Sequence, residues 1–368
     1  MIFLGQASNY HFGQALGHLF AWGNKHDSWV LKQQLARRYN AKADKVFLYH
    51  TGRSALTAAL QAIAPEGSGV VIPGLTCIAV VRAVRAAGCV PIFVDIDPNT
   101  LQYDWEALDK TLKVCYNVST IVAQNTLGLP LDMEKLEKVA HQHDLKIVED
   151  LAHCAGRFYP DGREIGTVGV AVALSFGKGK AIDTMAGGAL VLKSKAKIDP
   201  QQPTQLPHWS DRWRERWYPI LGAIIRGGYH IGLGKVFTAA FLQFHWIKKS
   251  ADAELNLETR LTHWQAKLAT RQLTNLPSTP LREYACVQER DKLLRVLRLK
   301  GYYLDEIWYD TPVSPARYAN EANFPTSECP NTVKVAAEII NYPSWYDAEQ
   351  IAPIKDVVRQ WQKGTHGE

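Results

Sequence analysis

The feature that most constrains the fold is an alternation of short apolar runs with helical stretches along the first half of the chain. The runs lack the polar alternation of a half-exposed strand, so each predicts a strand buried on both faces. Helical stretches between strands predict a parallel sheet with helices on both sides. We therefore expect an α/β fold whose mostly parallel, seven-stranded sheet is covered by helices. The expected strands are 46–49, 70–72, 90–94, 120–123, 145–148, 170–176 and 189–192.

A chain of 368 residues predicts two domains. The larger, 1–254, should carry the sheet and include a Trp-rich helical insertion at about 200–254, where the alternation breaks. The smaller, 255–368, is expected to be a C-terminal α+β domain. In it we predict helices at 260–273, 283–299 and 347–362.

Composition excludes several classes of protein. The six cysteines are scattered without a CxxC pair, which argues against a structural metal site and against a disulfide scaffold. No uncharged apolar run approaches the roughly 20 residues that a membrane-spanning helix needs, and the N-terminus lacks the pattern of a secretory signal. The net charge of +6 is mild, and no nucleic-acid-binding module is present. We expect a cytoplasmic protein with no bound metal and no nucleic-acid partner.

Lys180 lies in a glycine-rich turn between two apolar strands. A lysine amine attacks an aldehyde only when it is neutral, and its free pKa is near 10.4. Burial lowers that pKa and makes the amine a nucleophile. Lys180 is therefore a candidate Schiff-base lysine for pyridoxal phosphate (PLP). A solvated loop lysine is the alternative, and Lys178 is a rival two residues away.

Asp150 and the turn 51–54 add two further pieces of such a site. Asp150 ends an apolar strand, where a buried carboxylate needs a partner such as the protonated pyridine nitrogen of PLP. A cap of the next turn is the alternative. Thr51-Gly-Arg-Ser54 leads into a helix, and helix N-termini bind phosphate. Ser175 could donate its hydroxyl to the same phosphate, whereas Ser54 could equally be a plain helix cap. The carboxyl ends of parallel strands bring these segments to one edge of the sheet.

Taken in order, these segments resemble the DegT/DnrJ/StrS-type sugar aminotransferases of PLP fold type I. The spacing from Lys180 to Gly187-Gly188 is similar to that of the family, which favours Lys180 over Lys178. The resemblance extends over most of the chain and is looser in the last hundred residues. The matching segments are Thr51-Gly-Arg-Ser-Ala-Leu56, 71–88, Val90-Pro-Ile-Phe-Val-Asp-Ile-Asp-Pro98, Gly128-Leu-Pro-Leu-Asp-Met133, Ile147-Val-Glu-Asp-Leu-Ala-His153, 175–188, Thr259-Arg-Leu-Thr262 and Gln265-Ala266.

The resemblance implies roles for individual residues. Lys180 would hold the cofactor covalently and move the proton, Asp150 would pair with the pyridine nitrogen, and His153 would lie near the ring. A packing histidine is the alternative for His153. The phosphate would be held by Gly52, Arg53, Ser54 and Ser175.

The implied reaction moves an amino group, by family habit from glutamate, to a keto sugar. The acceptor would be nucleotide-linked and used for polysaccharide or natural-product biosynthesis. A PLP-binding regulator or scaffold with little turnover and a PLP enzyme of another reaction type are the alternatives.

Two positions depart from the family pattern. Cys77 stands where the family has an aromatic residue stacked on the pyridine ring, and a thiol offers less stacking area. Glu258 stands where the family has an asparagine that reaches a phosphate across a dimer interface. A carboxylate there would repel the phosphate. Both departures bear on the substrate and neither touches Lys180 or Asp150.

The insertion combines tryptophans with basic residues, as in Arg212-Trp-Arg-Glu-Arg-Trp217. This composition is typical of homodimer interfaces, and we expect a homodimer. It is also typical of helices at a membrane interface. The alternative is therefore peripheral contact with the inner membrane face through 209–249.

Overall fold

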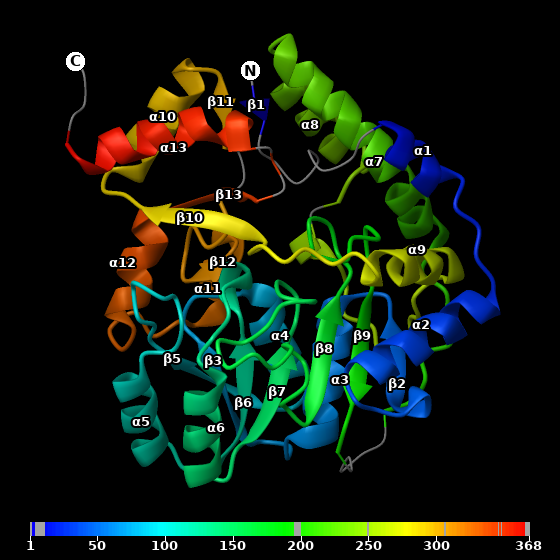
Figure 1. The fold of residues 1–368 in the computed structure, drawn as a ribbon, viewed down its shortest axis with the longest axis vertical. Helices are drawn as coiled ribbons and strands as arrows, with labels where there is room; N and C mark the ends of the chain where they lie inside the picture. The colour runs from blue at the N-terminus through cyan, green and yellow to red at the C-terminus, as the bar shows by residue number, and fades with distance from the viewer. Residues whose placement is uncertain are drawn as a thin grey trace.

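The computed structural model describes residues 2–3, 12–194, 200–248, 250–304, 307–344, 346 and 348–364. Their centre is a seven-stranded sheet of order β2-β9-β8-β7-β6-β3-β5 (Figure 1). All strands run in one direction except β9, which is antiparallel to both neighbours. The predicted α/β fold with a mostly parallel seven-stranded sheet is confirmed. The strands are β2 (Val46–Tyr49), β3 (Gly69–Pro73), β5 (Val90–Val94), β6 (Val118–Gln124), β7 (Lys146–Asp150), β8 (Ala171–Ser175) and β9 (Gly188–Leu192).

Helices bury both faces of this sheet. Successive side chains of a strand point to opposite faces. Val71 packs in one apolar cluster, while Val70 and Ile72 pack in another. Because both faces are covered, the strands carry no polar alternation. The first cluster includes residues of α2 (Lys25–Arg38), α5 (Trp105–Val114), α6 (Met133–Gln142) and α9 (His263–Leu273), and the second includes α3 (Gly52–Ile63) and α4 (Ile78–Ala86).

Local sequence sets where several helices begin. The Thr51 hydroxyl accepts the backbone N–H of Ser54 at 3.0 Å and caps α3. Asn24 and Asp27 form a reciprocal capping box at α2, and Asp104 and Asp132 cap α5 and α6. Such side chains satisfy backbone donors that the first helical turn leaves without partners. The start of α3, with its capped turn, is thereby fixed directly after β2.

The C-terminal part is a small α+β unit, at the upper left in Figure 1. The expected helix at 283–299 is wrong in its first part. β10 (Arg282–Cys286) pairs antiparallel with β13 (Ile339–Pro343), and only α10 (Arg290–Leu299) is helical. Glu289, with φ +53°, separates strand from helix, and the pairing partner lies too far along the chain for local sequence to show it. The other elements of this part are α11 (Ala319–Ala322), α12 (Pro330–Glu338), α13 (Ala348–Gln362), β11 (Tyr302–Tyr303) and β12 (Val313–Ser314). β11 pairs with β1 (Ile2–Phe3), and β12 pairs with β4 (Thr76–Cys77), two short strands from the N-terminal half of the chain.

The border between the two units follows from packing. Ala266, Ala269 and Leu273 of α9 belong to the same apolar cluster as Leu31 and Leu35 of α2. A separate cluster joins α10, α13 and β13. We therefore propose that the smaller domain begins between α9 and β10, rather than at residue 255.

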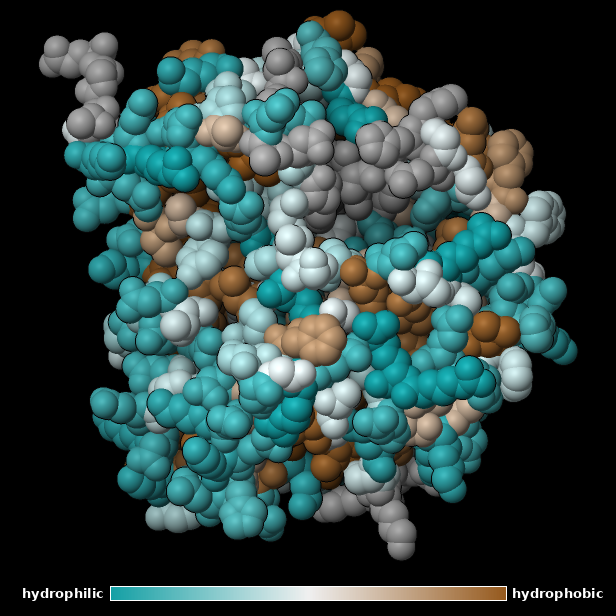
Figure 2. Space-filling view, viewed as in Figure 1, coloured by the Kyte–Doolittle hydropathy of each residue, from teal (hydrophilic) through white to brown (hydrophobic). Residues whose placement is uncertain are grey.

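The Trp-rich segment is helical, as predicted. It forms α7 (Trp209–His230) and α8 (Gly234–Gln243), which pack together, and α7 also packs against α1 (Phe12–Leu19). Apolar side chains reach the surface in this region, toward the upper right of Figure 2. Among the helices that the structure describes, none has the length and apolarity needed to cross a membrane.

Candidate active site

Lys180 lies in a turn that is held at several points between β8 and β9. The Asp183 carboxylate accepts the backbone N–H of Gly179 at 2.7 Å. The Gln272 side chain of α9 accepts the backbone N–H of Asp183 at 2.6 Å and donates to its carbonyl at 2.8 Å. The Asp183 carboxylate, inside the turn, and the Gln272 amide, outside it, therefore fix the backbone around Lys180.

The Lys180 side chain points into protein rather than into bulk water. Its Nζ lies 4.5 Å from the centre of the Trp308 ring, and the side chain keeps only partial solvent access. Burial lowers the Lys180 pKa to about 8. Nearby Cys77 and Asp150 raise it, and Arg282 lowers it further. A substantial fraction of this amine is therefore neutral near physiological pH, as a nucleophilic lysine requires.

Lys178 is held elsewhere. Its Nζ donates to the Lys248 carbonyl at 2.7 Å and lies 3.8 Å from the centre of the Tyr218 ring. These contacts attach the turn to α7 and to the segment after α8. Lys180, in contrast, is close enough to Asp150 for the two charges to influence each other.

Asp150 lies at the carboxyl end of β7, beside the lysine turn. Its Oδ1 accepts the backbone N–H of Ala152 at 2.9 Å, so the cap role that the sequence left open does exist. Burial raises the Asp150 pKa, while the Ala152 N–H and the charge of Lys180 lower it. Across the described part of the chain, no cation forms an ion pair with this carboxylate. The group can therefore accept a proton-bearing partner.

Arg282, Trp308 and Tyr309 of the C-terminal domain complete the site, and no sequence pattern indicated them. The His153 ring lies 5.0 Å from that of Trp308, and its Nδ1 lies 3.4 Å from the Tyr309 hydroxyl. The Arg282 guanidinium lies 4.6 Å from the centre of the Trp308 ring. Burial, with the charges of Lys180 and Arg282, holds the His153 pKa well below its usual value. His153 is therefore neutral beside the reactive amine.

The predicted phosphate turn meets Ser175. A Cβ at position 52 would lie 2.6 Å from the Ser175 Cβ and 2.7 Å from its Oγ, so only glycine allows this approach. The Ser54 hydroxyl donates to the Asn256 carbonyl at 3.1 Å and lies 2.9 Å from the Thr51 hydroxyl. The turn thus brings Gly52 and Ser175 together. Thr51, and not Ser54, caps the helix, while the Ser54 hydroxyl is bonded to Asn256.

The Arg53 side chain also points away from the turn. Its guanidinium donates to the carbonyls of Ala251 and Ala253, with Nη2 at 3.1 Å from the Ala251 oxygen. Any contact of Arg53 with a phosphate would therefore come from its backbone N–H, since a helix start offers such donors.

Cys77 and Glu258, the two departures from the family pattern, lie in different surroundings. The Cys77 sulfur accepts the backbone N–H of Ala79 at 3.4 Å at the start of α4, and Cys77 influences the pKa of Lys180. Glu258 is exposed and accepts a hydrogen bond from the Gln205 side chain. Glu258 therefore does not face the phosphate turn of its own chain; the carbonyl of Asn256 lies there instead.

A family model for DegT/DnrJ/EryC1/StrS aminotransferases matches residues 34–226, just over half of the chain. GDP-perosamine synthase from Escherichia coli O157:H7 is 32% identical over 176 residues, which cover 46% of each protein. The match thus spans less than half of that relative. UDP-N-acetyl-3-dehydro-alpha-D-glucosamine 3-aminotransferase from Acidithiobacillus ferrooxidans is 25% identical over 85% of this chain and 83% of its own.

Solved structures share the whole fold. Spr1654 from Streptococcus pneumoniae, in its PLP form, aligns over 100% of both chains with a TM-score of 0.69 and 16% identity. Helicobacter pylori PseC, an aminotransferase involved in the biosynthesis of pseudoaminic acid, aligns over 99% of this chain and 100% of its own. Its TM-score is 0.69 at 15% identity. At these identities the likeness shows the fold, and the predicted PLP fold type I is confirmed.

Proposed function

Because the chain belongs to the DegT/DnrJ/EryC1/StrS aminotransferase family, we propose that it is a PLP-dependent aminotransferase acting on a keto sugar. PLP is the cofactor of this family, and the family resemblance expected from the sequence is confirmed. The observation that carries the proposal is the position of the Lys180 amine near the partly buried carboxylate of Asp150, at the carboxyl end of β7.

The residues present fit PLP. Gly52 and Ser175 leave a close-packed turn at a helix start, with backbone donors for a phosphate. Asp150 offers a carboxylate, in no ion pair that the described chain shows, for the pyridine nitrogen. Lys180 offers an amine that is partly neutral. Bound PLP supplies an aldehyde and an electron-withdrawing ring.

Each residue has a proposed role. Lys180 would hold the cofactor through its aldehyde and would carry the proton to and from the substrate carbon. Asp150 would keep the ring nitrogen protonated. Neutral His153 can donate or accept one hydrogen bond at the ring without adding charge.

Trp308 supplies an aromatic face near Lys180, at a site where Cys77 contributes none. This indole already contacts Lys180, His153 and Arg282. We propose that it limits the space above the reactive amine and so takes part in selecting the substrate.

The proposed amino donor is glutamate, and the proposed acceptor is a nucleotide-linked keto sugar. Arg282 supports the donor assignment because it places a buried positive charge near Lys180 that suits a carboxylate. The names of the relatives, a GDP-perosamine synthase and a UDP-linked 3-dehydro-sugar aminotransferase, support the acceptor class.

Borohydride trapping tests the assignment. Treatment of the holoprotein should fix the cofactor on the peptide that contains Lys180, and glutamate should bleach the visible absorbance before trapping. Lys180→Ala should lose the adduct, whereas the matched control Lys178→Ala should keep it. An adduct on another lysine would refute the site. A trapped cofactor that no amino donor bleaches would favour a regulator over an enzyme.

We further propose that the protein is a homodimer. Support comes from exposed apolar side chains at the C-terminal half of α7 and along α8. Ile224 and Val236 lie on these helices, and Ile231 and Phe244, which are 69% and 67% exposed, follow directly after them. Sedimentation of Ile231→Ser with Val236→Ser should show monomers. A bilayer is the alternative occupant. If the double variant is still a dimer, as the wild type is, but no longer pellets with vesicles, the result would favour the bilayer.

A further inference from the structure

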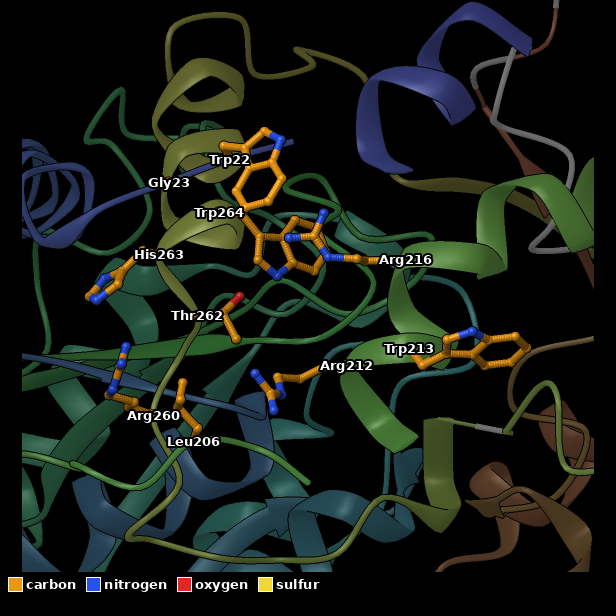
Figure 3. A pocket seen from close by; sticks show the side chains of 10 residues that line it. All are labelled: Trp22, Gly23, Leu206, Arg212, Trp213, Arg216, Arg260, Thr262, His263 and Trp264. Atoms are coloured by element: carbon orange, nitrogen blue, oxygen red, sulfur yellow. The ribbon is translucent and has the colours of Figure 1, made fainter. Parts of the chain in front are cut away.

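A basic hollow lies on the N-terminal half of α7 and shares no residue with the candidate active site. Its volume is about 290 Å³. Figure 3 shows Arg212 and Arg216 extending from α7 toward Thr262 and Trp264 at the start of α9, with Arg260 on the opposite side. The lining thus combines three guanidinium groups with indole rings and includes no acidic residue.

Among the described residues, the positive charges of this hollow have no carboxylate partner. Within the part of the chain that the structure describes, no carboxylate forms an ion pair with Arg212, Arg216 or Arg260. The two acidic residues of α7 are engaged elsewhere. Asp211 pairs with Arg214 at 2.7 Å, and Glu215 pairs with His50 at 3.1 Å.

The guanidinium groups also keep unused hydrogen-bond donors. Each has five N–H groups. The Nη1 of Arg216 donates to the carbonyls of Leu19 and Ala21. Arg260 donates to the carbonyls of Thr204 and Leu261. The Arg212 Nε is buried and makes no hydrogen bond.

Holding these cations together costs free energy. Arg212 and Arg216 are four residues apart on one helix, where like charges repel. Burial lowers the Arg216 pKa, and the charge of Arg212 lowers it further. An anion in the hollow would remove this repulsion.

The indoles define the rest of the ligand. Trp264 is buried beneath the Arg216 guanidinium at 4.7 Å, whereas Trp22 is 80% exposed at the rim. Leu206 and Trp213 are also exposed at the edge of the hollow. Arginines bind phosphate oxygens bidentately, and an exposed indole packs against a flat or apolar group.

We propose that this hollow binds a phosphate-bearing ligand, with its phosphate between Arg212, Arg216 and Arg260 and its apolar or planar part on Trp22. A soluble nucleoside diphosphate and an anionic lipid headgroup share this chemistry. The inference does not require the proposed transamination, because it concerns binding at residues outside the candidate active site.

Calorimetry with inorganic pyrophosphate and with uridine diphosphate tests the soluble source, and pelleting with phosphatidylcholine vesicles containing phosphatidylglycerol tests the lipid source. Arg212→Gln and Arg260→Gln should each lower the affinity for whichever probe binds the wild type by roughly tenfold or more. The matched control is Arg214→Gln, which removes a neighbouring arginine already paired with Asp211, and it should bind normally. Thermal melts establish that each variant is folded.

Trapping of the cofactor on Lys180 in the same variants separates this inference from the proposed function. Normal trapping with weakened probe binding supports a second site. Binding of pyrophosphate that is competed by vesicles assigns the lipid source, and binding of uridine diphosphate alone assigns the nucleotide. If wild type binds none of the probes, or if all variants bind them equally, the hollow is not an anion site.

Discussion

The pKa of Lys180 gives the sharpest test of the site. With a pKa of about 8, roughly a quarter of the amine is neutral at pH 7.5. A lysine at its ordinary pKa of 10.5 would be neutral to roughly 0.1% at that pH. Since only the neutral amine attacks an aldehyde, burial should raise the attachment rate at this pH roughly 200-fold.

The sign of the pH dependence follows directly. Rising pH removes the proton from the amine, so the attachment rate should increase with pH and level off above a midpoint near pH 8. Asp150 raises the Lys180 pKa and Arg282 lowers it. Asp150→Asn should therefore move the midpoint to lower pH, and Arg282→Gln should move it to higher pH. Arg282→Lys keeps the positive charge and should leave the midpoint in place.

The assay starts from apoprotein mixed with PLP between pH 6.5 and 10.5, quenched with borohydride at short times. The adduct on the Lys180 peptide is then measured by mass spectrometry. Nα-acetyl-lysine treated in parallel corrects for ionisation of PLP itself. A midpoint near 10.5, or shifts of the same sign in Asp150→Asn and Arg282→Gln, would refute the description of Lys180 as a buried amine coupled to these two charges.

Three further predictions concern packing around the site. Gly52→Ala should lower both the melting temperature and cofactor retention, because the added Cβ would lie 2.6 Å from that of Ser175. Adding Ser175→Gly should restore the melting temperature but not cofactor retention. An unchanged melting temperature in the single variant would contradict the contact. Trp308→Leu removes the aromatic face and should weaken PLP binding roughly two- to tenfold, as measured by equilibrium dialysis. Trp308→Phe keeps an aromatic ring and should retain PLP binding. An equal loss of affinity in both variants would contradict a role for the aromatic face. Glu149→Gln should cost roughly 2–4 kcal/mol in urea unfolding, because the Glu149 carboxylate is buried and accepts several hydrogen bonds; a change below about 0.5 kcal/mol would show that these bonds are dispensable.

The sheet and the lysine turn were predictable because local signals specify them. Apolar runs without alternation indicated strands covered on both sides, and glycine-rich segments marked the turns around Lys180 and after β2. The edge of a parallel sheet then brought Gly52, Asp150 and Ser175 together without any knowledge of side-chain contacts.

The C-terminal contribution was not predictable on these grounds. Trp308 and Arg282 reach the site through pairing of β10 with β13 and through the packing of one domain on the other. Such contacts join segments that are far apart in sequence and leave no periodic signal. The misassigned start of the 283–299 helix has the same origin, since a strand whose paired residues lie 53 to 61 positions away cannot be recognised from its own few residues.

β7 ends in two neighbouring carboxylates, Glu149 and Asp150, that have different roles. Adjacent residues of a strand point to opposite faces. Glu149 faces a closed shell in which Tyr159 donates at 2.7 Å and the backbone N–H groups of Gly166 and Val168 donate at 2.6 and 2.9 Å. Asp150, on the other face, receives one backbone N–H and lies near Lys180. A carboxylate whose acceptors are already filled stabilises the fold, whereas one that retains acceptor capacity beside a cation can bind a ligand. The strand sequence alone distinguishes the two faces, but only the hydrogen bonds show which face is closed.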